Sequence, residues 1–513
     1  MVHIRLLVKK GHILKIGERM IEIYLSGHAF EYETKDIVSL FYSEPVVFVK
    51  ASDKPLSQKR GLFIMSIASE TEGKIELFTK VQREDTFFEY KMSVEIPKSP
   101  IVHKRTVRRM VKRGILNVLR QLESKEIPWG ILTGIRPTKI LRELEERGFS
   151  SDSIFQQLEQ EFGVSEEKAN LMLKVTQNEK RIMLNSDSNS ISIYLGIPFC
   201  PDRCLYCSFT TNPIKRFNNL VEPFMAAVNR EIESVGEIIR QKGWKIETLY
   251  VGGGTPTSLN YEHMKKLLQI LDKEFGLQRI KEITVEAGRP DTLDQGKIRI
   301  LKEFGVNRIS INPQTMNEAT LKLIGRNHSV ESIHRAFEIA RGADFNNINM
   351  DIIAGLPGEN LDMFDLTMKE IRQLKPESIT IHTLALKKGS KLFRQKESYF
   401  LPEDAVVEEM LEKCRTESNE MGMIPYYMYR QKNMIGLQEN VGYCMPSKEC
   451  IYNIKMIEEV QNIIALGPGG VSRIMDFETR KINKTYNDRS TEGYISRIDE
   501  MIKKKEGALG IKK

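Results

Sequence analysis

Between residues 190 and 385, short apolar runs alternate with amphipathic stretches of helix length. Each run ends at a Gly or Pro turn, and the following stretch spaces its apolar residues three and four apart, as in a helix with one buried face. This alternation is typical of consecutive βα units, which form a parallel sheet. We expect strands at 191–199, 248–254, 283–288, 308–313, 348–357 and 378–385, and helices at 221–240, 261–275, 292–304 and 363–374. The pattern predicts an α/β fold, a partial (β/α)6 barrel with its active site at the carboxyl ends of the strands.

The flanking parts of the chain follow other patterns. Short β-rich runs precede residue 104, and mostly helical patterns then continue to 184. The polar stretch 185–189 has the composition of a linker. After residue 385 the pattern becomes mainly helical, as at 403–421, and 465–472 is a glycine-rich turn. We therefore predict an α+β N-terminal domain of unknown role over 1–185, the barrel over 186–385, and a mainly helical C-terminal lid or substrate region over 386–513.

Composition places the chain among soluble globular proteins. Its 513 residues are 41% hydrophobic and 28% charged, and a chain of this length normally divides into several domains. No apolar stretch is long enough to span a membrane, and the opening residues lack a cleavable signal, so we expect a cytoplasmic protein with no membrane span. The net charge of +8 suits an anionic ligand but does not by itself indicate nucleic acid, and no nucleic-acid partner is expected.

Three of the six cysteines lie within eight residues, directly after the first predicted strand. Cys200, Cys204 and Cys207 have C-x3-C-x2-C spacing, which lets each thiolate hold one iron of a 4Fe-4S cluster and leaves the fourth iron open. An open iron can chelate the amino and carboxylate groups of S-adenosylmethionine, and electron transfer then breaks the sulfonium bond to give a 5′-deoxyadenosyl radical. The alternatives are buried free thiols or a zinc site, but structural zinc normally has four protein ligands.

The sequence around these cysteines resembles a known family. YLGIPFC at 194–200, followed by Cys204, Cys207 and Phe209, is similar to the signature of the oxygen-independent coproporphyrinogen III oxidases, a family of radical S-adenosylmethionine (radical SAM) enzymes. The resemblance covers about 190–480, and LTGIRPTKI at 132–140 resembles the HemZ-type, coproporphyrinogen dehydrogenase-like branch. Gly196 stands where the oxidases have histidine, and Phe209 where they have a further cysteine. Neither position is a cluster ligand in the family, so these differences leave the cofactor chemistry intact and weaken only the assignment of the substrate.

The resemblance implies two cofactors, a 4Fe-4S cluster held by Cys200, Cys204 and Cys207 and S-adenosylmethionine. Tyrosines would contact the sulfonium and adenine, glycine amides can approach the cofactor because no Cβ intervenes, and acids, an amide and a guanidinium would bind its amine, ribose and carboxylate groups. Each residue alone is also compatible with an ordinary packing or capping role. The implied cofactor-binding residues are Tyr194, Tyr206, Gly253, Gly254, Thr255, Glu286, Gln314, Arg326 and Asp351, with Ala385 and Ile474 at positions where the oxidases hold a second S-adenosylmethionine. No catalytic residue is assigned.

Two functions follow from the resemblance. The first is a radical SAM oxidoreductase, an oxygen-independent coproporphyrinogen III dehydrogenase that converts coproporphyrinogen III to protoporphyrinogen IX by oxidative decarboxylation in haem biosynthesis. Its partners would be a tetrapyrrole substrate and a reductant such as flavodoxin or ferredoxin, and the chain would act as a monomer. The second is a haem-binding chaperone or a radical SAM haem-modifying protein, as other relatives are.

Two further signals have simpler explanations. Cys414, Cys444 and Cys450 are too widely spaced for a compact ligand loop, so we interpret them as buried thiols, with a second cluster as the alternative. Basic residues crowd the helix start at 104–113 and the motif 136–139. The first is interpreted as a solvated helix face, with an anionic or RNA partner as the alternative. The second is either a plain helix start or an anion-binding one.

Overall fold

The computed structural model describes residues 20–49, 61–134, 136–184, 187, 189–476, 479 and 481–510. They form two compact units, one of Met1–Gly134 with Leu144–Asn170 and the other of Ile135–Glu143 with Leu171–Lys513. Most of the predicted linker and a β-rich run at 3–10 lie outside the described residues. In the part of the chain that the structure describes, no helix is long and apolar enough to cross a membrane. The two domain boundaries expected from the sequence, after residues 185 and 385, stay predictions.

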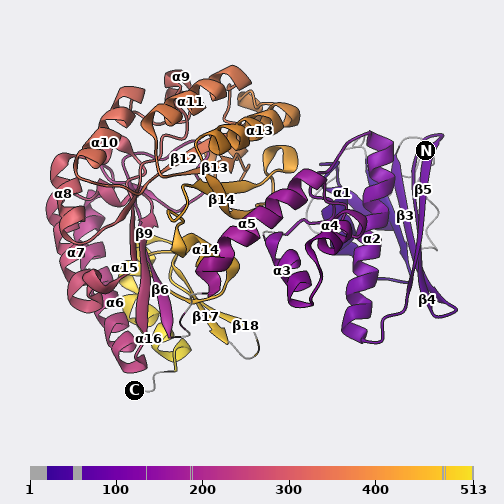
Figure 1. Ribbon diagram of the computed structural model, residues 1–513, viewed down its shortest axis with the longest axis horizontal. Coiled ribbons are helices and arrows are strands. Elements are labelled where there is room, and N and C mark those ends of the chain that lie inside the picture. Colours follow the sequence, from indigo (N-terminus) through magenta and orange to yellow (C-terminus); the bar gives the residue numbers. More distant parts are fainter. Residues whose placement is uncertain are drawn as a thin grey trace, which may run out of the picture. The chain divides into compact units, whose positions relative to one another are not determined.

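The first unit is a sheet covered by helices (Figure 1). Apolar residues alternate along its strands, and one set is buried against the apolar stripe of the longest helix, where Val111, Ile115 and Leu119 are fully buried. The strands are β1 (Ile21–Ser26), β2 (Val46–Val49), β3 (Leu62–Thr71), β4 (Lys74–Arg83) and β5 (Thr86–Glu95), in the order β2-β1-β3-β4-β5. The helices are α1 (Glu31–Val38), α2 (Pro100–Glu123) and α4 (Ser151–Gln160). The predicted α+β N-terminal fold is confirmed.

The basic face of α2 is largely paired with carboxylates of its own unit. Arg108 Nε lies 2.9 Å from Glu33 Oε1, Arg109 pairs with Glu161, and Lys112 lies 3.9 Å from Asp36. These pairs neutralise much of the charge that the sequence concentrates at 104–113. The helix is therefore a poor candidate for an anionic partner.

The second unit contains the predicted barrel. All six expected strands form, and each pairs in parallel with the next along the chain. They are β6 (Ser190–Ile197), β9 (Lys245–Gly253), β10 (Glu282–Glu286), β11 (Arg308–Ser310), β12 (Ile348–Ala354) and β13 (Ser378–Thr383). Most of their residues are buried, which explains why they appear in the sequence as nearly continuous apolar runs. The partial (β/α)6 barrel is confirmed.

Helices connect these strands and form a curved row along their outer side (Figure 1). Five of them follow a residue whose side chain accepts a hydrogen bond from the backbone N–H three positions on, namely Asn260, Asp294, Asn317, Ser329 and Asn360. The helices are α6 (Val221–Lys242), α7 (Tyr261–Phe275), α8 (Gln295–Glu303), α9 (Glu318–Leu323), α10 (Val330–Gly342) and α11 (Leu361–Leu374).

The C-terminal region adds strands to both edges of the barrel sheet. The strand β15 (Asn440–Cys444) pairs antiparallel with β13, and β16 (Asn462–Leu466) pairs in parallel with β6. With β14 (Ile424–Tyr429), β17 (Val471–Asp476) and β18 (Lys481–Tyr486) they extend the sheet to eleven strands. The expected helices are also present, as α12 (Lys391–Arg394), α13 (Asp404–Glu420), α14 (Ile451–Glu458), α15 (Thr491–Ser496) and α16 (Ile498–Ala508). The region thus combines the expected helices with strands that complete the sheet.

A buried polar cluster holds the end of the chain to the barrel. Glu231 of α6 is completely buried and accepts 2.6 Å hydrogen bonds from Lys505 Nζ and the Tyr494 hydroxyl. It also accepts from the Asn487 amide and from the backbone N–H of Gly467, each at 2.8 Å. Since Gly467 lies in the predicted glycine-rich turn at 465–472, this cluster anchors the turn to α6.

The helices α3 (Thr138–Glu146) and α5 (Glu166–Leu184) complete the fold. The motif 136–139 contacts carboxylates at the end of α14: Thr138 Oγ1 donates to Glu458 at 3.0 Å, and Arg136 lies 2.6 Å from Glu459. Arg142 bridges Glu458 and the buried Glu179. The motif therefore binds groups of its own chain.

Candidate active site

A cavity of about 700 Å³ opens at the carboxyl ends of the barrel strands. Its walls come from the cluster loop, the strand ends of the barrel, and the added strands on both edges. The predicted site residues that line it are Cys200, Cys204, Cys207, Tyr194, Tyr206, Gly253, Gly254, Thr255, Glu286, Gln314, Arg326, Asp351 and Ala385. Ile474 is not among the lining residues, whereas Val471 and Arg473 of the same strand are. The cavity lining therefore does not support the predicted contact between Ile474 and a cofactor.

The loop that carries the three cysteines is fixed by backbone hydrogen bonds. Its start, β7 (Phe199–Cys200), pairs with β8 (Asn212–Pro213), and the Leu205 N–H donates to the carbonyl oxygen of Ile324 at 2.9 Å. Among the described residues, no three His, Cys, Asp or Glu side chains lie close enough to share one metal ion. A 4Fe-4S cube instead takes each thiolate on a different iron, so three thiols lining one cavity fit a cluster.

A glycine turn after β9 supports this loop. Gly253 has φ 102°, a conformation that favours glycine. A Cβ on Gly254 would lie 2.5 Å from the carbonyl oxygen of Phe199 and 3.0 Å from Cys200 Sγ. The next residue, Thr255, donates its hydroxyl to Cys200 Sγ at 3.6 Å. Because Gly253 and Gly254 have no side chains, the end of β9 can lie in direct contact with the backbone of the cluster loop.

Burial favours the protonated form of two thiols that face the cavity, those of Cys200 and Cys207. Burial raises the pKa of Cys200 to about 11, opposed by the Thr255 hydrogen bond and reinforced by the Cys207 and Cys204 thiols. Burial also raises the pKa of Cys207. Because thiolates are the ligands of iron, cluster assembly must displace these protons.

Glu286, at the end of β10, has a carboxyl group that accepts hydrogen bonds from the Tyr250 hydroxyl and the backbone N–H of Gly253. The Tyr250 hydroxyl donates to its Oε1 at 2.7 Å. Burial raises the pKa of Glu286 to about 7, the Tyr250 hydrogen bond lowers it, and the charge of Asp351 raises it further. Such a group changes its charge near neutral pH and can accept a hydrogen bond from a cofactor amine or hydroxyl.

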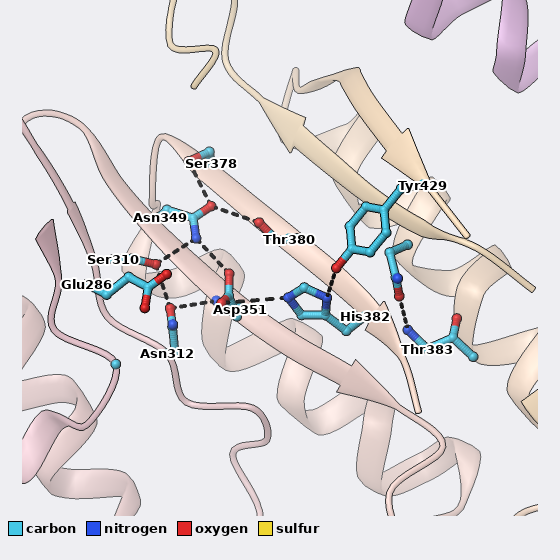
Figure 2. A network of polar contacts seen from close by, with 12 residues as sticks. Glu286, Ser310, Asn312, Asn349, Asp351, Ser378, Thr380, His382, Thr383 and Tyr429 are labelled. Carbon is cyan, nitrogen blue, oxygen red and sulfur yellow. Dashed lines mark hydrogen bonds and ion pairs between the residues drawn. The ribbon is translucent and has the colours of Figure 1, made fainter. Parts of the chain in front are cut away.

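Asp351 belongs to a polar network that crosses the barrel strands (Figure 2). Its carboxylate accepts from the Asn349 amide at 2.8 Å and lies 3.6 Å from His382 Nε2. The other nitrogen of that ring, Nδ1, lies 3.3 Å from the Tyr429 hydroxyl. Burial would raise the pKa of Asp351, but the contacts with His382, Asn349 and Thr380 together lower it. Asp351 is therefore held as a carboxylate.

Arg326 joins three parts of the site. Its Nη1 donates to the carbonyl oxygens of Asn312 and Gly288, at 2.5 and 3.2 Å, and its guanidinium bonds the Tyr206 hydroxyl and Cys204 thiol. The guanidinium is almost fully buried. It therefore places a fixed positive charge beside the cluster loop, where a carboxylate would be bound.

Several lining residues were not predicted from the sequence. His382 and Tyr429 belong to the network of Figure 2. Lys387 follows β13, and burial lowers the pKa of its ammonium group. Arg473 lies on β17 at the other edge of the sheet and donates to the carbonyl oxygen of Met456 at 3.1 Å. Tyr452 stacks on Tyr250 with ring centroids 4.7 Å apart. Of these residues, only His382 could have been identified from the sequence, because it is a polar residue inside an apolar run that predicts a strand.

The remaining cysteines are separate from this site. Cys414, Cys444 and Cys450 are buried, and none lines the cavity. Cys450 Sγ donates to Glu282 at 3.4 Å, and Cys414 packs against Met368. Their interpretation as buried thiols is confirmed.

Comparison with known proteins agrees with this site. Residues 194–371 match the Radical SAM superfamily. The fold is similar to that of the coproporphyrinogen III oxidase HemN from Escherichia coli, titled a radical SAM enzyme, with a TM-score of 0.50 and 21% identity over 63% of this chain and 72% of that one. The protein is therefore of the radical SAM class, whose members use a 4Fe-4S cluster and S-adenosylmethionine.

Sequence relatives define the family more narrowly. The chain is 39% identical over 416 residues to the oxygen-independent coproporphyrinogen-III oxidase-like protein HemZ of Bacillus subtilis (strain 168), covering 79% of this chain and 83% of HemZ. It is 32% identical over 238 residues to the heme chaperone HemW of the same organism, covering 46% of this chain and 62% of HemW. The chain belongs to the oxygen-independent coproporphyrinogen III oxidase-like family, in its HemZ-type branch.

Proposed function

We propose that this protein catalyses the oxygen-independent oxidative decarboxylation of coproporphyrinogen III to protoporphyrinogen IX, as a step of haem biosynthesis. The observation that carries the proposal is the single cavity in which three thiols of one loop face the polar ends of the barrel strands. Cys200, Cys204 and Cys207 would hold the cluster. When bound, the cluster and S-adenosylmethionine together supply a radical that removes hydrogen from an unactivated carbon.

The chain's own residues would bind and orient the cofactor. Arg326 would bind a carboxylate next to the cluster loop, because its buried guanidinium is fixed by backbone carbonyls. Glu286 and Asp351 would accept hydrogen bonds from the amine and ribose hydroxyls. Tyr194 and Tyr206 would pack against the sulfonium and adenine. The added strands at both edges contribute Tyr429 and Arg473 to the cavity wall.

The cationic lining of the cavity supports a substrate with several carboxylates. Lys387 and Arg473 come from opposite edges of the barrel sheet. Two cations separated in this way can bind two propionates of one tetrapyrrole, and so fix which propionate faces the cluster loop. The removal of one hydrogen from that propionate, with loss of carbon dioxide and one electron, gives a vinyl group.

The second candidate function is haem binding and delivery, favoured by the similarity to the heme chaperone HemW. A chaperone of this kind needs an accessible ligand for the haem iron. His382 lines the cavity, but its ring nitrogens face Tyr429 and Asp351. These contacts disfavour haem ligation by His382.

An anaerobic assay tests the proposal. The reconstituted protein is incubated with a reductant, S-adenosylmethionine, coproporphyrinogen III and an electron acceptor, and the vinyl products are separated by chromatography. We expect vinyl product from the native protein and none from Cys204→Ala. Stoichiometric haem binding without vinyl product would favour the chaperone instead.

A further inference from the structure

A short basic segment packs directly on the cluster loop. The Leu392 N–H donates to the carbonyl oxygen of Leu205 at 2.9 Å, and Arg203 Nη2 donates to the carbonyl oxygen of Gly389 at 3.1 Å. Leu205 and Leu392 belong to the same buried apolar cluster. The segment 387–396 is therefore held at the protein surface nearest the backbone of the cluster ligands.

The exposed side chains of this segment are mostly cationic. Lys388, Lys391, Arg394 and Lys396 are exposed, and so is Arg203 on the cluster loop. We name these five residues the basic rim. Two carboxylates accompany them, Asp202 and Glu397, both exposed. The surface beside the cluster loop therefore carries a clear positive excess.

The basic rim also lacks internal neutralisation. Elsewhere in the same unit, exposed arginines pair with carboxylates, as Arg240 does with Glu237 and Glu274. No residue of the basic rim has an ion pair with any described residue of the chain. Asp202 instead accepts from the Asn327 amide at 3.1 Å. Unpaired positive charge on one face favours an acidic partner, because charge complementarity steers association.

An exposed aromatic side chain lies beside these charges. Phe209 follows the third cysteine by two positions, lines the mouth of the cavity, and is 64% exposed. Aromatic residues are enriched at protein interfaces, whose rims are polar. Phe209 lies two residues after the last predicted cluster ligand, so a partner bound here lies next to the loop that would hold the cluster.

We propose that the basic rim and Phe209 form the docking surface for a small acidic one-electron carrier protein that reduces the cluster. In this step the carrier loses one electron and the cluster gains one, and no covalent bond forms or breaks. The inference rests on the proposed cluster ligands but not on the tetrapyrrole substrate. A reduction assay without tetrapyrrole can therefore disprove the docking surface without disproving the proposed function.

The test compares stopped-flow reduction of the reconstituted full chain by an acidic flavodoxin with reduction by reduced methyl viologen, a small cation that needs no docking surface. The variant Lys388→Glu/Lys391→Glu/Arg394→Glu reverses the rim and leaves the cavity residues unchanged. The control Lys503→Glu/Lys504→Glu reverses two exposed lysines of α16. At low salt we expect the rim variant to be reduced by flavodoxin at least about tenfold more slowly, with a weaker salt dependence. The control should keep the native rate, and methyl viologen should reduce all three proteins without loss of rate.

A charge swap gives a second, independent measurement. A flavodoxin with lysines in place of acidic residues on its docking face should reduce the rim variant faster than the native protein. An unchanged flavodoxin rate in the rim variant would overturn the proposal, and it is also the result expected if the rim served a nucleic acid. An equal loss with methyl viologen would overturn it too, because the substitutions would then act on the cluster itself.

Discussion

The Tyr250 hydroxyl donates a 2.7 Å hydrogen bond to the Glu286 carboxyl group inside the barrel. Without that bond the pKa of Glu286, which burial raises to about 7, would be higher still. The pair therefore sets the pH at which one predicted cofactor ligand becomes charged. This is a property of two neighbouring strands, β9 and β10.

Cofactor affinity should depend on this ionisation. Glu286 is mostly protonated below its pKa of about 7, and an ionised carboxylate is the stronger acceptor for an amine or hydroxyl. S-adenosylmethionine should therefore bind more tightly as the pH rises from about 6 to about 8. Calorimetric titration across this range would measure the trend, which Glu286→Gln should flatten. Tyr250→Phe should move the midpoint to higher pH, because the hydrogen bond it removes lowers that pKa. Identical profiles for all three proteins would contradict the assignment.

His382 should act through Asp351. The variant His382→Gln removes one of the contacts that lower the pKa of Asp351, so S-adenosylmethionine binding should weaken by about tenfold, corresponding to about 1.4 kcal/mol. Tyr429→Phe removes only the outer hydrogen bond of the network and should have a smaller effect. The measurement is the dissociation constant of the cofactor on reconstituted protein at fixed pH. A larger effect from Tyr429→Phe than from His382→Gln would contradict the proposal that His382 acts directly on Asp351 and Tyr429 only through His382.

The glycine turn should be essential for cluster assembly. In Gly254→Ala the new Cβ would meet Phe199 and Cys200 at 2.5 and 3.0 Å, so the cluster loop must shift. We expect less than about half of the native iron content after anaerobic reconstitution, with the fold retained by circular dichroism. The matched control is Gly342→Ala in α10, where a Cβ meets no atom within 4 Å. Full iron incorporation in Gly254→Ala would show that the loop does not depend on this close approach.

The buried pair of Lys505 and Glu231 should hold the C-terminal helices and the glycine-rich turn together. Lys505→Met leaves Glu231 as a buried carboxylate without its cation, at a cost of about 3 kcal/mol or more. Hydrogen exchange in α15, α16 and the backbone around Gly467 should accelerate by about 100-fold or more. Lys504→Met, at an exposed neighbour, should leave exchange within a factor of about two. Equal exchange in the two variants would mean that the pair contributes no local stability.

The sequence was sufficient for the barrel because its parallel strands are buried on both faces. Runs such as β12 are mostly apolar and are followed by glycine, so the strand and its start are visible, although the expected run 348–357 extends past the strand end at Ala354. The added strands gave no such signal. The strand β16, Asn462–Leu466, is followed by the strands β17 and β18 and not by a helix, so it lacks the βα alternation that marks the barrel strands. Its partner β6 lies far away along the chain, so only the tertiary fold identifies it.

The residues of the candidate active site were also only partly predictable from the sequence. Glu286 and Asp351 were predicted from the resemblance to the family, and the structure places Glu286 at the end of β10 and Asp351 inside β12. His382 lies inside a strand run, and Arg473 is on a strand that the sequence did not reveal. Ile474 was proposed by resemblance, yet its neighbours line the cavity instead. Resemblance aligned the region but could not give the alternation of side chains along an antiparallel pair.

The central claim is that one cavity unites the cluster loop with a tetrapyrrole propionate. The most direct measurement is a single anaerobic turnover with coproporphyrinogen III deuterated at the β-carbons of its propionates, followed by mass spectrometry of 5′-deoxyadenosine. The account predicts deuterium in 5′-deoxyadenosine, formed in proportion to the vinyl product. 5′-Deoxyadenosine without deuterium, and no vinyl product, would contradict it.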